Sequence, residues 1–137
     1  MSEESKATLL RLFEDLLNGN NLAVLDEIVS PDFVNHSPSM GVTPDREGWR
    51  TSLGRILAAL SDMHYEVYDL IGEGEMAALR FTSQATHVGE LYGIAPSGRT
   101  VYWAGMFICR VVDGKMMERW EMRTDMTMLQ QLRGGSS

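Results

Sequence analysis

VYWAGMFICRVVDGKMMERWEMRTD, residues 101–125, is the stretch that decides the fold. Two strand-like runs, 101–112 and 115–122, flank the pair Asp113-Gly114. Asp-Gly between two such runs is a strong hairpin signal, because both residues tolerate the positive φ that a type I′ turn requires. We therefore predict two long antiparallel strands. The second ends in Trp120, Arg123 and Asp125 as it leaves the sheet, which makes this strand end the first place to look for chemistry.

Three segments upstream of this hairpin have apolar residues at helical spacing. The first covers residues 9–17 and stops at Asn18-Gly19-Asn20, and the second covers residues 22–29. The third takes Thr43 as its N-cap and Pro44 as its first helical residue, and continues to residue 60. We therefore predict three helices before the sheet.

Strands are predicted where the apolar period changes from 3.6 to 2, at residues 64–71 and 76–88, after a short extended piece at 32–36. If the strand at 76–88 is regular, His87 shares a face with Leu79 and Phe81. Three helices followed by four long strands predict one α+β domain over residues 1–133, with the helices packed on one face of a mostly antiparallel sheet. Residues 134–137 are expected to be a disordered tail.

Composition and charge exclude several classes of partner. The formal net charge of −7 argues against a nucleic-acid-binding protein, which needs clustered Lys and Arg. No apolar run approaches the ~20 residues that cross a bilayer, and the acidic start lacks the features of a signal peptide, so we expect a cytoplasmic protein without membrane contact. The single cysteine, Cys109, lies in an apolar run and is expected to be a buried hydrophobe.

Several motifs resemble the SnoaL-like polyketide cyclases and predicted ester cyclases. They are THVGELYGIAPSGR at 86–99, Asp113-Gly114-Lys115, and Glu118-Arg119-Trp120 followed by Asp125. The resemblance covers nearly the whole chain. It implies an NTF2-like cone, in which three helices and a strongly curved sheet surround a deep pocket, and a homodimer that forms through the sheet.

The resemblance also implies a reaction. The characterised cyclases close a ring by intramolecular aldol condensation without metal or cofactor. Asp125 matches their acid/base aspartate, and His36 matches a position at the pocket mouth. Those cyclases pair the aspartate with a histidine on the preceding strand, but residues 101–112 contain none, so His36 and His87 are the candidates to replace it.

The residues themselves allow a similar interpretation. A carboxylate in an apolar pocket becomes a stronger base as desolvation raises its pKa. Asp125 is such a candidate, unless it caps the last helical turn or pairs with Arg123. On a regular strand Trp120 and Asp125 fall on opposite faces, and a bulge between them would bring both to the pocket. The side chains expected to contact a small hydrophobic substrate are Trp120, His87, Trp49, Met122, Phe107 and Arg123.

Two other functions remain open. The pocket could bind a small molecule without turnover, or it could hydrolyse an epoxide, which would require two carboxylates beside an arginine. Arg123 and Asp125 supply part of that set, and Asp69 is the one obvious second acid, although we expect it to be exposed. The three histidines have no metal-ligand spacing, so no metal site is expected, and the family resemblance implies that no cofactor is needed.

Overall fold

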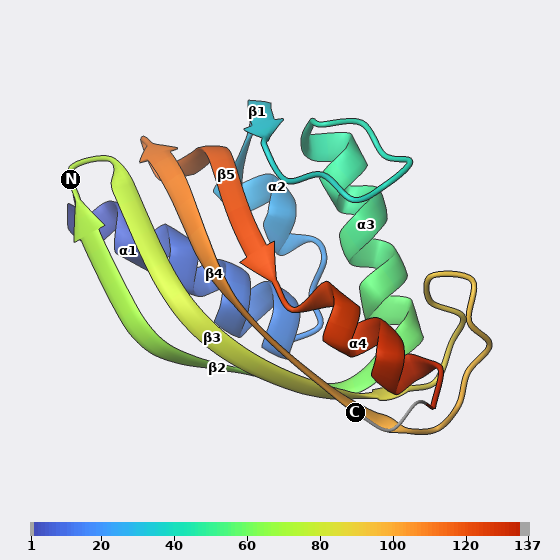
Figure 1. Cartoon of the computed structure of the whole chain (residues 1–137). Helices are drawn as coiled ribbons and strands as arrows, with labels where there is room; N and C mark the ends of the chain where they lie inside the picture. Colours follow the sequence, from blue (N-terminus) through green and yellow to red (C-terminus); the bar gives the residue numbers. More distant parts are fainter. Residues whose placement is uncertain (1, 135–137) are drawn as a thin grey trace.

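A computed structural model describes residues 2–134, apart from the side chains of residues 125 and 126. Its five-stranded sheet has the order β1-β5-β4-β3-β2 (Figure 1). The strands are β1 (Val29–Asn35), β2 (Leu60–Glu73), β3 (Met76–His87), β4 (Thr100–Val112) and β5 (Lys115–Arg123). The helices are α1 (Ser2–Arg11), which continues as the π-helix η1 (Leu12–Asn18), α2 (Val24–Ile28), α3 (Arg46–Ala59) and α4 (Asp125–Leu132). The predicted α+β class is confirmed. The tail predicted at 134–137 falls, from residue 135 onward, outside the described residues.

The hairpin between β4 and β5 forms at the predicted pair. Asp113 and Gly114 have φ values of 52° and 72°, and Val112 pairs with Lys115 across the turn. Just beyond the turn, β5 contains one extra residue. Val111 pairs with Met116 and Arg110 pairs with Glu118, so Met117 has no partner and forms a bulge.

The bulge at Met117 decides which side chains of β5 face the helices. Met116 points inward before it, and from Arg119 onward the odd-numbered residues point inward. Trp120, on the other parity, is directed to the outer face of the sheet. The bulge thus brings charged side chains into the interior.

A fifth strand, β1, was predicted only as a short extended piece. It starts at Val29, three residues earlier than predicted, and pairs in parallel with β5, while the other strand pairs are antiparallel.

Helix α3, in contrast, starts later than predicted. Asp45, and not Thr43, is its N-cap, because the Asp45 carboxylate accepts a hydrogen bond from the Gly48 N–H at 2.9 Å. Thr43 donates its hydroxyl to that carboxylate.

The core lies between α1, η1, α3 and the concave face of the sheet (Figure 1). Phe13 of η1 contacts the rings of Tyr65, Phe81 and Phe107, with centroids 5.3, 5.2 and 5.6 Å away. Alternate residues of β3 from Ala77 to His87 are buried, which confirms the predicted parity of this strand. Cys109 is buried, as predicted, and none of the helices within residues 2–134 is long and apolar enough to span a membrane.

Candidate functional site

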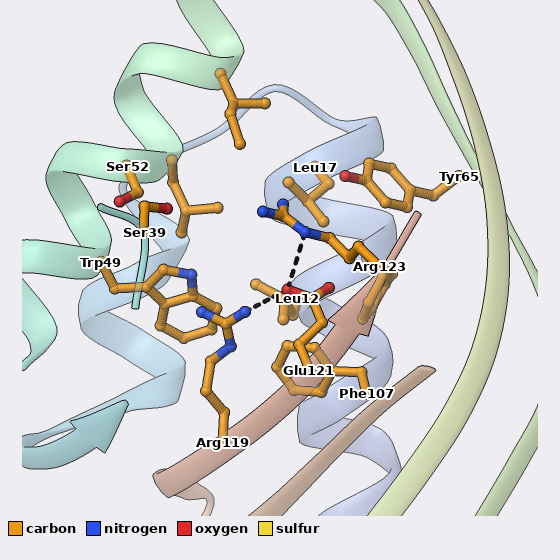
Figure 2. A pocket seen from close by; sticks show the side chains of 13 residues that line it. Leu12, Leu17, Ser39, Trp49, Ser52, Tyr65, Phe107, Arg119, Glu121 and Arg123 are labelled. Atoms are coloured by element: carbon orange, nitrogen blue, oxygen red, sulfur yellow. Dashed lines mark hydrogen bonds and ion pairs between the residues drawn. The ribbon is translucent and has the colours of Figure 1, made fainter. Parts of the chain in front are cut away.

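An inner cavity lies between η1, α3 and the two strands of the central hairpin (Figure 2). Its volume is about 30 Å³, enough for about two water molecules. The described residues that line it are Leu12, Phe13, Leu17, Ser39, Trp49, Ser52, Leu53, Ile56, Tyr65, Phe107, Arg119, Glu121 and Arg123. Most of the lining residues are apolar or aromatic, and three charged side chains from a single strand lie among them.

These charged side chains are Arg119, Glu121 and Arg123, which alternate along β5 and so share its inner face. Figure 2 shows the Glu121 carboxylate between the two guanidinium groups. Its Oε1 accepts a hydrogen bond from Arg119 Nη2 and lies 3.8 Å from Arg123 Nε. The side chains of Arg119, Glu121 and Arg123 are 6%, 10% and 20% exposed. A carboxylate is thus held, nearly desolvated, at the wall of the cavity.

The guanidinium of Arg119 is fixed by aromatic rings as well as by Glu121. Its central carbon lies 4.8 Å from the ring of Trp49 and 5.2 Å from the ring of Phe107. Trp49 is itself stacked on Phe33 at 5.0 Å. Burial lowers the pKa of Arg119, and the negative charge of Glu121 partly opposes this effect. The arginine is therefore held in one orientation at a cost in solvation.

Two polar groups of the cavity wall, Arg119 Nε and Ser52 Oγ, are buried without a hydrogen-bond partner among the described residues. The phenol of Tyr65 lies on the same wall. Burial, together with the charge of Glu121, raises the pKa of Tyr65, so its hydroxyl is neutral and able to donate a hydrogen bond. The cavity therefore has hydrogen-bond donors beside its carboxylate.

Three of the predicted contact residues, Trp49, Phe107 and Arg123, line this cavity. Trp120 and Met122 do not, because the bulge at Met117 turns the even-numbered residues of β5 outward. Met122 is 80% exposed.

His36 does not lie at the cavity mouth either. Its ring is stacked on that of Trp120 on the outer face, at 4.6 Å and with an interplanar angle of 6°. Its Nε2 lies 2.9 Å from the Glu118 carboxylate, which also accepts a hydrogen bond from Arg110 at 2.6 Å. These contacts hold the side chain of His36 outside the cavity.

His87 is fully buried and does not line the cavity. Its Nδ1 lies 3.0 Å from Ser97 Oγ and accepts a hydrogen bond from the Ser97 N–H at 3.3 Å, so it anchors the loop between β3 and β4. Asp125 is the first residue of α4, directly after its N-cap Thr124, and its side chain lies outside the described residues. Asp69 is 60% exposed and pairs with Arg80, as expected for a surface acid.

Arg119 and Glu121, which line the cavity, were not predicted from the sequence as contact residues. The signal was present, because Arg119, Glu121 and Arg123 repeat with period two at the end of a strand. The prediction relied instead on Trp120, which lies on the opposite face of the same strand. Within the described residues, no group of three or more His, Cys, Asp or Glu side chains could hold a metal ion.

Comparison with known proteins gives a consistent assignment. A family model described as SnoaL-like polyketide cyclase matches residues 7–132. No curated protein matches the chain significantly. Many solved structures share its fold, among them three from Streptomyces species.

AclR from Streptomyces galilaeus, described as a candidate hydroxylase, has 29% identity and a TM-score of 0.86, over 99% of this chain and 100% of that one. IdmH from Streptomyces antibioticus, described as a candidate polyketide cyclase, has 32% identity and a TM-score of 0.79, over 94% and 98% of the two chains. TsrD from Streptomyces laurentii has 27% identity and a TM-score of 0.78, over 95% and 97%. These similarities confirm the fold expected from the sequence resemblance.

Proposed function

Because the chain belongs to the SnoaL-like polyketide cyclase family, we propose that it catalyses an acid/base reaction on a hydrophobic carbonyl compound, without metal or cofactor. The inner cavity is the site. The observation that carries the proposal is the nearly desolvated Glu121 carboxylate, held between Arg119 and Arg123 in a cavity whose lining residues are mostly apolar or aromatic. The related structure described as a candidate polyketide cyclase supports a ring closure.

The proposed reaction is an intramolecular aldol closure. Glu121 removes a proton from the carbon next to a carbonyl, and the enolate oxygen accepts hydrogen bonds from donors of the wall such as Tyr65. The enolate carbon then attacks a second carbonyl of the same molecule, forming the new carbon–carbon bond. The resulting alkoxide takes the proton back from Glu121, so the sequence balances without a further reactant. The guanidinium groups stabilise the negative charge as it moves between oxygens.

A substrate with rings needs more room than about 30 Å³. Ser39 borders the cavity and lies on the connection between β1 and α3, where Gly41 has a φ of 83° and Met40 is 98% exposed. The side chain of Met40 therefore contributes no packing that would hold this connection in place. We propose that its outward movement widens the cavity for the substrate.

Asp125 is the second candidate for the base, as the family resemblance implies. It follows Arg123 by two residues, at the end of the chain segment that carries Glu121. Its role can be separated from that of Glu121 by the matched variants Glu121→Gln and Asp125→Asn, which remove either carboxylate charge with little change of shape.

The test measures exchange of the α-hydrogens of acetophenone for deuterium in D₂O, followed by proton NMR. We expect the wild type to exceed the buffer rate and Glu121→Gln to lose about 100-fold or more of that excess, the usual contribution of a general base. Asp69→Asn, at an exposed ion pair, is the control and should retain full activity. If only Asp125→Asn lost the exchange activity, Asp125 and not Glu121 would be the general base. A wild type that binds acetophenone without exchange would favour the non-catalytic binding function.

We further propose that a second copy of the chain covers the outer face of the sheet. Large apolar side chains are exposed together there: Tyr102, Met106, Ile108, Trp120 and Met122. Such a patch on a soluble chain is typical of a protein interface. Light scattering after size-exclusion chromatography should give a dimer for the wild type and a monomer for Ile108→Glu, with Met40→Glu as the control. A monomeric wild type at micromolar concentration would contradict this proposal.

A further inference from the structure

We propose that Ser37 is a positioning residue, whose hydroxyl holds the backbone of Glu121 so that this base stays in place while the adjoining connection moves. The inference rests on the proposed function, from which it takes Glu121 as the base and the movement of the connection between β1 and α3. It adds an anchor that separates the base from the moving part of that connection.

The first step is that β5 loses one of its two neighbouring strands just before Glu121. On one side β4 continues, and Phe107 pairs with Glu121. On the other side, the last pair between β1 and β5 is Asn35 with Arg119. The His36 N–H still donates to the Arg119 carbonyl oxygen at 3.0 Å. In a continued parallel ladder, the next bond would run from the Glu121 N–H to a carbonyl oxygen of β1.

The second step is that the Ser37 hydroxyl takes the place of this carbonyl. Ser37 Oγ accepts a hydrogen bond from the Glu121 N–H at 2.9 Å. The bond satisfies a backbone donor whose own side chain is only 10% exposed. It also fixes the backbone that carries the proposed base, and a misplacement of about 1 Å can cost about 100-fold in rate. Ser37 thus supports the geometry on which the reaction depends.

The third step is that Ser37 is itself held by the end of the strand. Its N–H donates to Asn35 Oδ1 at 2.9 Å, and Asn35 is 3% exposed. An asparagine side chain that bonds the backbone two residues later forms a local turn of its own. Pro38 follows Ser37 and disfavours a helical backbone at Ser37. The anchor therefore belongs to β1 and not to the loop that follows.

The fourth step is that the connection can move beyond this anchor. The Asn35 N–H donates to the Pro44 carbonyl oxygen at 2.9 Å, which joins the two ends of the connection (Figure 1). Between these ends, the Val42 N–H donates to the Ser39 carbonyl oxygen at 3.3 Å, a bond within the connection. Within the described part of the chain, no other backbone hydrogen bond involves residues 38–42. These residues can move while Ser37 stays bonded to β5.

The first test compares two serine hydroxyls that make the same kind of bond. Ser37→Ala removes the acceptor of the Glu121 N–H. Ser30→Ala is the matched control, because Ser30 Oγ accepts the Asp32 N–H at 3.0 Å on the same strand. In the deuterium exchange of acetophenone, Ser37→Ala should lower the maximal rate about tenfold, with the half-saturating concentration within about twofold of the wild type. Ser37→Thr keeps the hydroxyl and should restore most of the rate, and Ser30→Ala should retain it.

Hydrogen exchange of the Glu121 backbone amide gives a second readout that needs no substrate. In ¹⁵N-labelled protein transferred to D₂O, NMR should show slow exchange of this amide in the wild type, Ser37→Thr and Ser30→Ala. In Ser37→Ala it should exchange about tenfold faster, the change expected for the loss of one hydrogen bond. The wild-type measurement alone tests the anchor, even if Ser37→Ala does not fold.

The proposal is overturned if the wild-type Glu121 amide exchanges as fast as an unprotected peptide amide. It is also overturned if Ser30→Ala loses as much activity as Ser37→Ala, or if Ser37→Ala raises the half-saturating concentration at an unchanged maximal rate. A protected Glu121 amide in a wild type that does not exchange acetophenone would refute the proposed reaction and support the anchor. Exchange activity with an unprotected Glu121 amide would refute the anchor alone.

Discussion

The buried pair Arg119–Glu121 makes a prediction about stability that does not depend on any substrate. Replacing Glu121 by Met leaves the nearly buried Arg119 charge without its partner and beside the like charge of Arg123. Replacing Arg119 by Met is less disruptive, because Glu121 still has Arg123 Nε at 3.8 Å. The two single substitutions should therefore differ in cost.

Removing one partner of a buried ion pair costs about 3–5 kcal/mol of unfolding free energy. We expect this range for Glu121→Met and about 2 kcal/mol for Arg119→Met, because the remaining cation of Arg123 offsets part of the loss. The double variant removes both charges and fills the space with apolar side chains. It should be more stable than Glu121→Met alone. The sum of the losses of unfolding free energy in the two single variants should therefore exceed the loss in the double variant by about 3 kcal/mol.

Equilibrium urea denaturation of the wild type, the two single variants and the double variant measures these unfolding free energies. The matched control is the cycle on Arg80 and Asp69, which pair at 2.7 Å with side chains 51% and 60% exposed. Exposed pairs of this kind contribute less than about 1 kcal/mol. Additive costs at Arg119 and Glu121, or a larger coupling at the control pair, would refute the reasoning that burial determines the strength of the inner pair.

Three further predictions concern other parts of the chain. Gly114→Ala should lower the unfolding free energy by about 1 kcal/mol in urea titrations, because its φ of 72° disfavours a side chain; no change would indicate a different turn. Burial raises the pKa of the Cys109 thiol to about 12, so Ellman's reagent at pH 8 should react with it only after unfolding, and rapid reaction of the native protein would contradict its burial. Hydrogen bonds from Arg110 and then from His36 lower the pKa of Glu118 from its ordinary 4.5, so its contribution to stability is complete above pH 4.5 and is lost as the pH falls through the lowered pKa. Urea midpoints between pH 6 and 3 should therefore fall less steeply in Glu118→Gln, and identical slopes would show that the pair contributes nothing.

Local signals in the sequence predicted the hairpin and the main helices correctly. Asp113-Gly114 determines a turn by its own backbone preference, and Gly19 ends the helical segment that begins at α1. The predicted N-cap of α3, Thr43, was wrong, and Asp45 is the N-cap instead, because Asp45 offers a charged acceptor that Thr43 lacks. Such choices between neighbouring caps depend on small energy differences.

The faces of β5 could not be predicted, because they depend on a bulge formed with a partner strand. A regular β5 with Met116 inward would direct Glu118 and Trp120 inward as well, whereas the extra residue Met117 places Arg119 there. The position of β1 beside β5 is equally non-local, since it joins residues about 85 positions apart along the chain. The strand end that the sequence singled out does border the inner cavity, while pairing between distant strands determined which of its side chains face that cavity.

Helix α4 and its N-cap lie beside the first half of β4, where they make hydrogen bonds that a neighbouring strand would make. The Gln131 amide donates to the Tyr102 carbonyl oxygen at 2.9 Å and accepts from the Tyr102 N–H at 2.6 Å, while Thr124 exchanges two 3.0 Å hydrogen bonds with Ala104. Gln131 and Thr124 thus supply hydrogen bonds that a neighbouring strand would otherwise supply. A variant shortened before Gln131 would expose these backbone groups as an open sheet edge, the kind of edge that recruits strands from other molecules. The end of the helix therefore closes this part of the sheet edge.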